Sequence, residues 1–295
     1  RRVSDGTPEG VLRTVPITVI DKYEGSINSM LLITKEKIWK FVETFPDPFT
    51  GNSLNKLVTH VEILENGTLF TSMQRIFKVI DDNGTPSDPT DDKLVTYTLN
   101  YEGTLDLNNA SIHLFNPPAD SGIFLTSVTK TWRQQITPNP ATGLTGAYAG
   151  TITEIYEGTF FTATPAERFR TSKQVSYTAQ VAHTTGGDNK WVTLTETYEG
   201  EDPDPILVSI TYTYREERIT INGPKFTQVI ESYIPTGTDP QIDTVQYVYK
   251  KEENEGTIIV DVDDTTHGTT LNLLYKKLVT VIETRQAQAL DIPIS

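Results

Sequence analysis

A short motif that ends in glycine recurs six times along this chain. Four copies read Tyr-Glu-Gly, and the other two read Glu-Asn-Gly and Asn-Glu-Gly. Its glycines, spaced by roughly forty to fifty residues, are Gly25, Gly67, Gly103, Gly158, Gly200 and Gly256. Spacing of this length is typical of proteins built from repeated structural units. The best copies lie in runs that alternate apolar and polar residues, so the motif predicts a recurring β-strand rather than a catalytic loop.

The clearest alternating run extends from Val95 to Leu107. One face holds Val95, Tyr97, Leu99, Tyr101, Gly103, Leu105 and Leu107, and the other holds Thr96, Thr98, Asn100, Glu102, Thr104 and Asp106. A period of two over this length corresponds to a strand of about 43 Å, twice the usual length. Since a half-buried strand sends alternate side chains to opposite faces, we expect the tyrosine and leucine face to be buried.

Three further runs alternate in the same way: Val11–Ile27, Phe169–Val181 and Ile206–Tyr214. In the second of these, Phe169 falls on the same face as Val175, opposite Arg170. Helical periodicity is weak everywhere, and the neighbours of the one tempting stretch, residues 35–42, favour a strand. The sequence therefore predicts an all-β fold, with long antiparallel strands in hairpin repeats forming a large barrel or sandwich. Glycine in a strand often marks a bend, so we expect the repeated glycines to curl these strands around a core.

The chain has 295 residues, and a single β-sandwich or barrel can reach about 200–250 residues. We expect one large β domain at residues 21–286, with 138–146 as the seam if the domain divides. Residues 1–20 are a candidate exchangeable N-terminal strand, and residues 287–295 form a C-terminal tail.

Charge and composition exclude several classes of function. The net charge of −14 argues against a nucleic-acid partner, which needs a basic face, and disfavours binding to anionic lipid. The chain has no cysteine, which excludes disulfides, thiolate metal sites and cysteine nucleophiles. No run of eighteen apolar residues occurs, so we expect no transmembrane helix.

Catalytic motifs are missing from the sequence. There is no phosphate-binding glycine loop, no Gly-x-Ser-x-Gly elbow and no His-Glu-x-x-His pair. The four histidines occur singly and are interpreted as surface or strand residues: His60, His113, His183 and His267. The glutamates of the Tyr-Glu-Gly copies are interpreted as structural, because a repeated residue serves a repeated structural role. We therefore expect a non-enzymatic protein without catalytic or cofactor-binding residues.

Two acidic segments are candidates for cation binding. The first, on a loop rich in glycine and proline, comprises Asp81, Asp82, Asn83, Asp88, Asp91 and Asp92, and the second comprises Asp261, Asp263 and Asp264. Ca²⁺ takes six to eight oxygen ligands, which such segments can supply, so Ca²⁺ is the candidate cofactor. The alternative is that these are solvated turn residues, since neither segment matches the EF-hand pattern.

Other side chains suggest export or packing. Three sequons place candidate glycosylation sites at Asn66, Asn83 and Asn109. The three tryptophans, Trp39, Trp132 and Trp191, lie in strand-like runs, and we expect core or inter-strand packing for them rather than a sugar-binding platform.

The leading functional hypothesis is an extracellular or cell-surface structural protein, a subunit of a filament, tube or layer. Such a protein forms a homo-oligomer or polymer through β-strand contacts, because an unpaired sheet edge is a template for another strand. The first alternative is a ligand- or glycan-binding β-barrel module, which a cavity lined by the tyrosine and leucine face would favour. The second is an outer-membrane barrel, which strand length suits. Against it, its lipid-facing positions would include Glu154, Glu196 and Arg13.

Overall fold

The computed structural model of this chain describes residues 2–4, 12–14, 16–24, 31–66, 69–81, 92–103, 123–161, 168–181, 190–201, 205–220, 223–235, 241–261 and 270–286. Most of its described residues lie in β-strands, and the described part contains no α-helix. A single 3₁₀ turn at Pro140–Thr142 is the one short helical element there. The prediction of an all-β fold is therefore confirmed, and residues 35–42 lie within a strand as expected.

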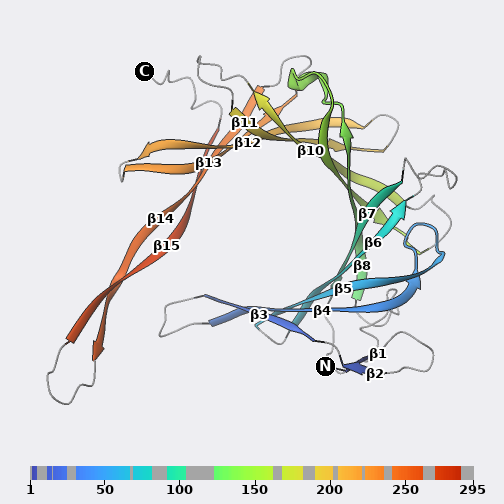
Figure 1. The fold of residues 1–295 in the computed structure, drawn as a ribbon, viewed down its shortest axis with the longest axis horizontal. Coiled ribbons are helices and arrows are strands. Elements are labelled where there is room, and N and C mark those ends of the chain that lie inside the picture. Colours follow the sequence, from blue (N-terminus) through green and yellow to red (C-terminus); the bar gives the residue numbers. More distant parts are fainter. Residues whose placement is uncertain are drawn as a thin grey trace. The chain divides into compact units, whose positions relative to one another are not determined.

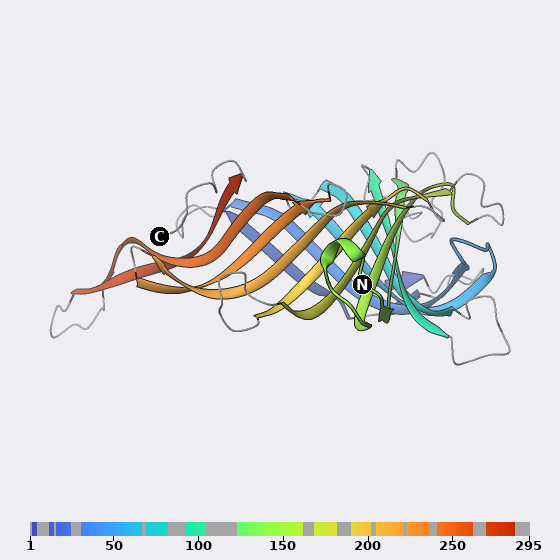
Figure 2. The same cartoon turned by 90° about the horizontal axis from the view of Figure 1, so that it is seen from above.

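Thirteen strands form one antiparallel sheet in which neighbours in the chain are neighbours in the sheet, from β3 to β15 (Figures 1 and 2). The strands are β1 (Arg2–Ser4), β2 (Leu12–Thr14), β3 (Thr18–Glu24), β4 (Leu31–Pro46), β5 (Ser53–Glu65), β6 (Leu69–Asp81), β7 (Lys93–Gly103), β8 (Ile123–Ile136), β9 (Tyr148–Gly158), β10 (Arg168–Val181), β11 (Lys190–Glu199), β12 (Ile206–Thr220), β13 (Gly223–Ile234), β14 (Gln241–Asp261) and β15 (Thr270–Gln286). The expected hairpin repeats are present. A barrel or sandwich describes the fold only loosely, because β3 and β15 end the strand order and are not paired with each other in the described part.

The N-terminal segment pairs within its own chain. Strand β1 pairs with β2 to form a separate two-stranded sheet, and β3 pairs with β4. In this single chain, β1, β2 and β3 therefore pair with strands of the same chain rather than with a second copy. Exchange of residues 1–20 between copies stays a prediction, and the tail 287–295 lies outside the described residues.

The glycine motif marks the ends of strands. Strands β7 and β9 end at Gly103 and Gly158, and Gly200 follows β11 directly. These glycines have φ angles of 142°, 108° and 88°, in a region that side chains with a Cβ rarely adopt. Strand β3 likewise ends one residue before Gly25, and β5 ends two residues before Gly67. Because alternate strands of an antiparallel sheet run in the same direction, these copies terminate the same end of successive hairpins.

The motif glycines were expected within or at the ends of strands, and the four that the structure describes agree with this. Gly256 lies inside β14, where the pairing with β15 shifts register between Asn254 and Gly256. At Gly103, Gly158 and Gly200 the strand ends instead, because a positive φ turns the backbone out of the extended conformation.

The chain divides into two compact units. Unit 1 comprises residues 1–136, 149–175 and 197–206, and unit 2 comprises residues 137–148, 176–196 and 207–295. Residues 138–146, the expected seam, group with unit 2.

The core of unit 1 follows the predicted alternation of β7. Tyr97, Leu99 and Tyr101 are buried, whereas Thr96 and Thr98 on the other face are half-buried and Glu102 is exposed. The ring of Phe77 stacks on Tyr97 at 5.3 Å, and Phe45 meets Phe77 edge-on at 4.6 Å. The side chains on this face pack against one another and form the core of unit 1. Leu105 and Thr104 lie outside the described residues.

Strand β10 departs from its predicted phase at its start. Phe169, on the expected apolar face, is 47% exposed, whereas Arg170 is 5% exposed. The apolar phase begins only at Val175, which is buried together with Tyr177 and Ala179. Arg170 is buried because its guanidinium has hydrogen-bond partners on that side, so polar pairing overrides the apolar pattern here.

Unit 2 has its own smaller core. Val229, Val245 and Tyr247 pack together on β13 and β14, with Tyr214 of β12 against them. The register of β12 and β13 places Tyr214 opposite Val229. The other face of the same strands therefore points away from this core.

Candidate functional site

The first predicted cation site is only partly described. Asp81 ends β6 opposite Lys93, and the exposed Asp92 precedes β7. Asp82, Asn83, Asp88 and Asp91 lie outside the described residues, as do Asp263 and Asp264 of the second site. Asp261 ends β14, and the structure does not describe its side chain. Within the described ranges, no group of three or more His, Cys, Asp or Glu residues could hold a metal ion, and Ca²⁺ binding stays a prediction.

Of the three candidate glycosylation sites, the structure describes Asn66. Its side chain is exposed, its φ is 50°, and its backbone N–H donates a 2.8 Å hydrogen bond to the carbonyl of Ile33. Asn83 and Asn109 lie outside the described residues. Glycosylation stays a prediction.

A buried polar cluster lies in unit 1 across β4, β5 and β6. His60 is fully buried, and its ring stacks on Trp39 at 5.3 Å and on Phe41 at 4.6 Å. Its Nε2 lies 3.2 Å from Oε2 of Glu43, and the strand register sets His60 opposite Arg75. His60 is thus a strand residue, as predicted, although it is buried rather than on the surface.

Glu43 has the most perturbed carboxyl group of this cluster. Burial raises its pKa from 4.5 to about 7, and the positive charge of Arg75 partly opposes that rise. A carboxyl group with this pKa can in principle exchange a proton at neutral pH. Because Glu43 is only 5% exposed and lies among core aromatic side chains, we assign it a structural role.

A second cluster in unit 1 surrounds Lys130 of β8. Its ammonium group lies 3.7 Å from the ring centre of Phe49, 5.3 Å from that of Tyr156 and 5.6 Å from that of Tyr97. Burial lowers the pKa of Lys130. Nearby carboxylates oppose this decrease, and the charge of Asp81 has the largest opposing effect. The aromatic faces offset part of the cost of burying the cation.

Pairs of tyrosine and glutamate recur in both units, and sequence reasoning missed them. In unit 1, Tyr156 donates a 2.7 Å hydrogen bond to Glu154, which also accepts one of 3.0 Å from Arg170. In unit 2 the donor–acceptor pairs are Tyr177–Glu196 at 2.6 Å, Tyr214–Glu231 at 2.7 Å, Tyr233–Glu231 at 2.9 Å and Tyr249–Glu283 at 2.7 Å. Burial, and then the adjacent carboxylates, raise the pKa values of Tyr177 and Tyr214.

A sequence signal exists for two of these pairs, Tyr156–Glu154 and Tyr233–Glu231. Both are Glu-x-Tyr, and residues two apart in a strand share one face. The other three pairs join different strands, so only the register shows them. In two copies the Tyr-Glu-Gly motif drew attention to the wrong glutamate, because Glu157 and Glu199 are exposed at strand ends. The structure also corrects the lipid-facing assignment of Glu154 and Glu196. Both are buried and hydrogen-bonded, so they do not count against an outer-membrane barrel.

The tryptophans separate into two groups. Trp39 is buried and Trp132 packs against the unit 1 core, as predicted. The prediction was wrong for Trp191, which is 68% exposed. Its neighbours Val192 and Leu194 are buried on the opposite face of β11, so the alternation of the strand directs the indole away from the core.

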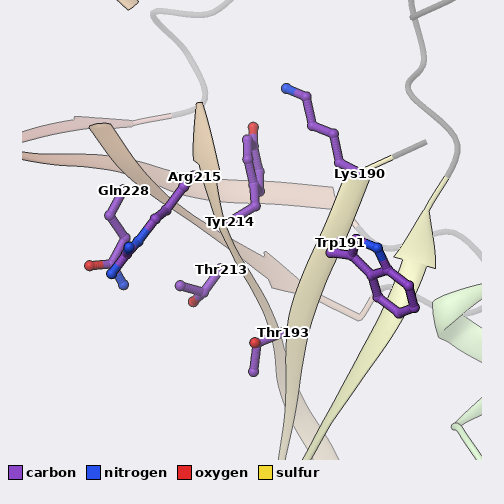
Figure 3. Close-up of a pocket in the computed structure, with 7 residues that line it drawn as sticks. All are labelled: Lys190, Trp191, Thr193, Thr213, Tyr214, Arg215 and Gln228. Atoms are coloured by element: carbon purple, nitrogen blue, oxygen red, sulfur yellow. The ribbon is translucent and has the colours of Figure 1, made fainter. Parts of the chain in front are cut away.

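Trp191 lines a pocket of about 500 Å³ in unit 2, which Figure 3 shows. The remaining lining residues come from β11, β12 and β13: Lys190, Thr193, Thr213, Tyr214, Arg215 and Gln228. Arg215 and Gln228 are direct partners in the register of β12 and β13, and their side chains lie close together in Figure 3. The indole of Trp191 lies toward the other side of the pocket (Figure 3). The volume falls within the usual range for small-molecule sites.

The polar groups of this pocket differ in their partners. Lys190 donates a 3.1 Å hydrogen bond to Glu216, and its ammonium lies 4.8 Å from the ring centre of Tyr214, which in turn bonds Glu231. In contrast, the side chains of Trp191, Arg215 and Gln228 make no hydrogen bond or ion pair with any other residue in the described ranges. The pocket therefore presents an aromatic surface, a guanidinium and an amide to whatever occupies it.

Comparison with known proteins gives no relative: no family model matches this chain, and neither does any curated protein or solved structure. In the part of the chain that the structure describes, no helix is long and apolar enough to cross a membrane.

Proposed function

We propose that this protein is an extracellular, non-enzymatic structural protein whose copies assemble through contacts between the edge strands of their sheets. The observation that supports this proposal is that β3 is an edge strand of the sheet. It lies at one end of the strand order, and within the described residues only β4 pairs with it.

The side chains of β3 are unusually accessible for a strand that begins a large sheet. Every one described, from Thr18 to Tyr23, is exposed, including Val19 at 51% and Tyr23 at 53%. Ion pairs hold β3 to β4, with Lys22 at 3.8 Å from Glu36 and Asp21 at 3.7 Å from Lys35. The strand is thus fixed on one side.

An ordered edge strand with free backbone groups is a template for a further strand. Main-chain hydrogen bonds supply the affinity of such an addition, and alternate side chains set its register. Apolar side chains such as Val19, Ile20 and Tyr23 add burial at about 25 cal/mol per Å² of surface removed from water. A second copy of the same chain provides an edge of identical length and pattern.

The test compares two charged variants. Val19→Lys combined with Ile20→Lys places positive charge along the β3 edge, and Leu57→Lys places it at an equally exposed aliphatic position on β5, inside the sheet. Light scattering after gel filtration and negative-stain microscopy measure assembly. We expect the wild type and Leu57→Lys to form oligomers or polymers and the β3 variant to stay monomeric. A monomeric wild type, or a β3 variant that assembles as the wild type does, overturns the proposal.

A further inference from the structure

The pocket on β11, β12 and β13 of unit 2 is a candidate ligand-binding site that does not depend on the sheet edges. Here outer-face pocket means the part of that pocket formed by Trp191, Thr193, Thr213, Arg215 and Gln228; the other two lining residues, Lys190 and Tyr214, lie on the core face of their strands (Figure 3). These five residues lie on the strand face opposite the core residues Val192, Leu194 and Val229, as the alternation of burial shows.

An exposed tryptophan is the first clue to an occupant. Other large apolar side chains of this chain are also exposed, such as Phe226 at 80% and Ile206 at 70%, so the position of Trp191 in a pocket lining carries the argument rather than its exposure alone. The indole of Trp191 offers a flat apolar face together with a free N–H donor. Ligands that combine apolar C–H faces with hydroxyl groups match such a side chain, and sugar rings have both properties.

Charge is the second clue. The chain has a net charge of −14, yet among the described residues the pocket lining contains Lys190 and Arg215 and no carboxylate. Glu216 neutralises Lys190 through the 3.1 Å contact, which leaves Arg215 as the cation with no described partner. A guanidinium binds a carboxylate through two parallel hydrogen bonds, which makes it selective for that planar group.

The neighbouring polar groups fit the same ligand class. Gln228 lies directly opposite Arg215, and its amide both donates and accepts, as sugar hydroxyls require. Thr193 and Thr213 add hydroxyl groups between Arg215 and Trp191 (Figure 3). From the aromatic face, the unpaired guanidinium and these hydrogen-bonding groups, we infer that the outer-face pocket binds a carboxylate-bearing saccharide of the uronic-acid type.

The experiment titrates the full chain with a trimer of galacturonic acid, with its methyl-esterified form and with a neutral galactose trimer. Calorimetry measures affinity, and tryptophan fluorescence reports on Trp191, the most exposed of the three indoles. We expect saturable binding of the acid. We expect affinity to fall about tenfold or more for the ester and for the variants Trp191→Ala and Arg215→Gln, since a bond to a charged group contributes at least this much.

Matched controls come from unit 1, where Phe124 and Arg133 are exposed on β8. Phe124→Ala and Arg133→Ala should bind the acid trimer as the wild type does. Arg215→Lys keeps the charge but loses the planar fork, so it should bind between the wild type and Arg215→Gln. Circular dichroism confirms that each variant is folded. Equal affinity for acid and ester, unchanged affinity of Trp191→Ala or Arg215→Gln, or no saturable binding overturns the inference.

Discussion

Replacing Glu43 with glutamine should change how the stability of unit 1 depends on pH. The pKa of this carboxyl group is raised from 4.5 to about 7 in the folded protein, because burial disfavours its charged form. The folded state therefore binds a proton more tightly than the unfolded chain. This contribution to stability is fully present below pH 4.5 and is lost as the pH rises through about 7.

The size of the effect follows from the two pKa values. Each pKa unit corresponds to about 1.4 kcal/mol, so ionising Glu43 in the folded state costs about 3 kcal/mol by pH 8. Glutamine has the same shape and no charge, and the variant should lack this loss. The groups that face Glu43 are His60, whose Nε2 is 3.2 Å away, and Arg75, whose charge opposes the raised pKa. Both remain in the variant, so the difference between the two proteins isolates Glu43.

The assay is urea unfolding between pH 4 and pH 8.5, followed by tryptophan fluorescence in a Trp191→Phe background. The remaining indoles, Trp39 and Trp132, both belong to unit 1, so the signal reports on that unit. Glu65→Gln, at an exposed carboxylate that ends β5, is the control and should keep the wild-type slope. If Glu43→Gln loses stability with rising pH as steeply as the wild type does, the argument from burial is wrong.

Three further outcomes are expected. Arg170→Ala should lower the free energy of unfolding by about 3–5 kcal/mol in chemical denaturation, because it leaves the buried carboxylate of Glu154 without its 3.0 Å partner; a loss below 1 kcal/mol contradicts this. Gly200→Ala should cost about 1–2 kcal/mol in the same assay through its φ of 88° alone, since an added Cβ meets nothing within 4 Å, and an unchanged midpoint would refute the strain. Ca²⁺ should raise the melting temperature of the wild type but not of the double variant Asp81→Asn, Asp92→Asn; a melt insensitive to Ca²⁺ and to chelator makes these aspartates ordinary turn residues.

Sequence periodicity predicted strands well wherever apolar burial alone decides the faces. In β7, the alternation of Tyr97, Leu99 and Tyr101 with threonines gave both the strand and its buried side. It failed at the start of β10, because a buried arginine with hydrogen-bond partners looks in sequence like a surface residue. Those partners, Glu154 and the carbonyl of Gly200, are distant in the chain, so local pattern could not show them.

Part of the pocket could have been predicted from the sequence. The alternation of Val192 and Leu194 already places Trp191 on the opposite face, so its exposure could have been predicted from β11 alone. Its neighbours could not, because the pairing of Arg215 with Gln228 depends on the register of β12 and β13. Register is a tertiary property that turn geometry and packing decide.

The main sheet has an odd number of strands among the described residues, thirteen, and this count constrains symmetry. In an antiparallel sheet of odd count, the first and last strands, β3 and β15, run in the same direction. Joining them to each other would therefore create a parallel pair. In the edge-strand assembly proposed above, a two-fold axis perpendicular to the sheet would instead set β3 of one copy antiparallel to β3 of the next, and a second such axis would do the same for β15. Alternating these two isologous contacts would generate an open chain of subunits in which the described strands keep antiparallel neighbours.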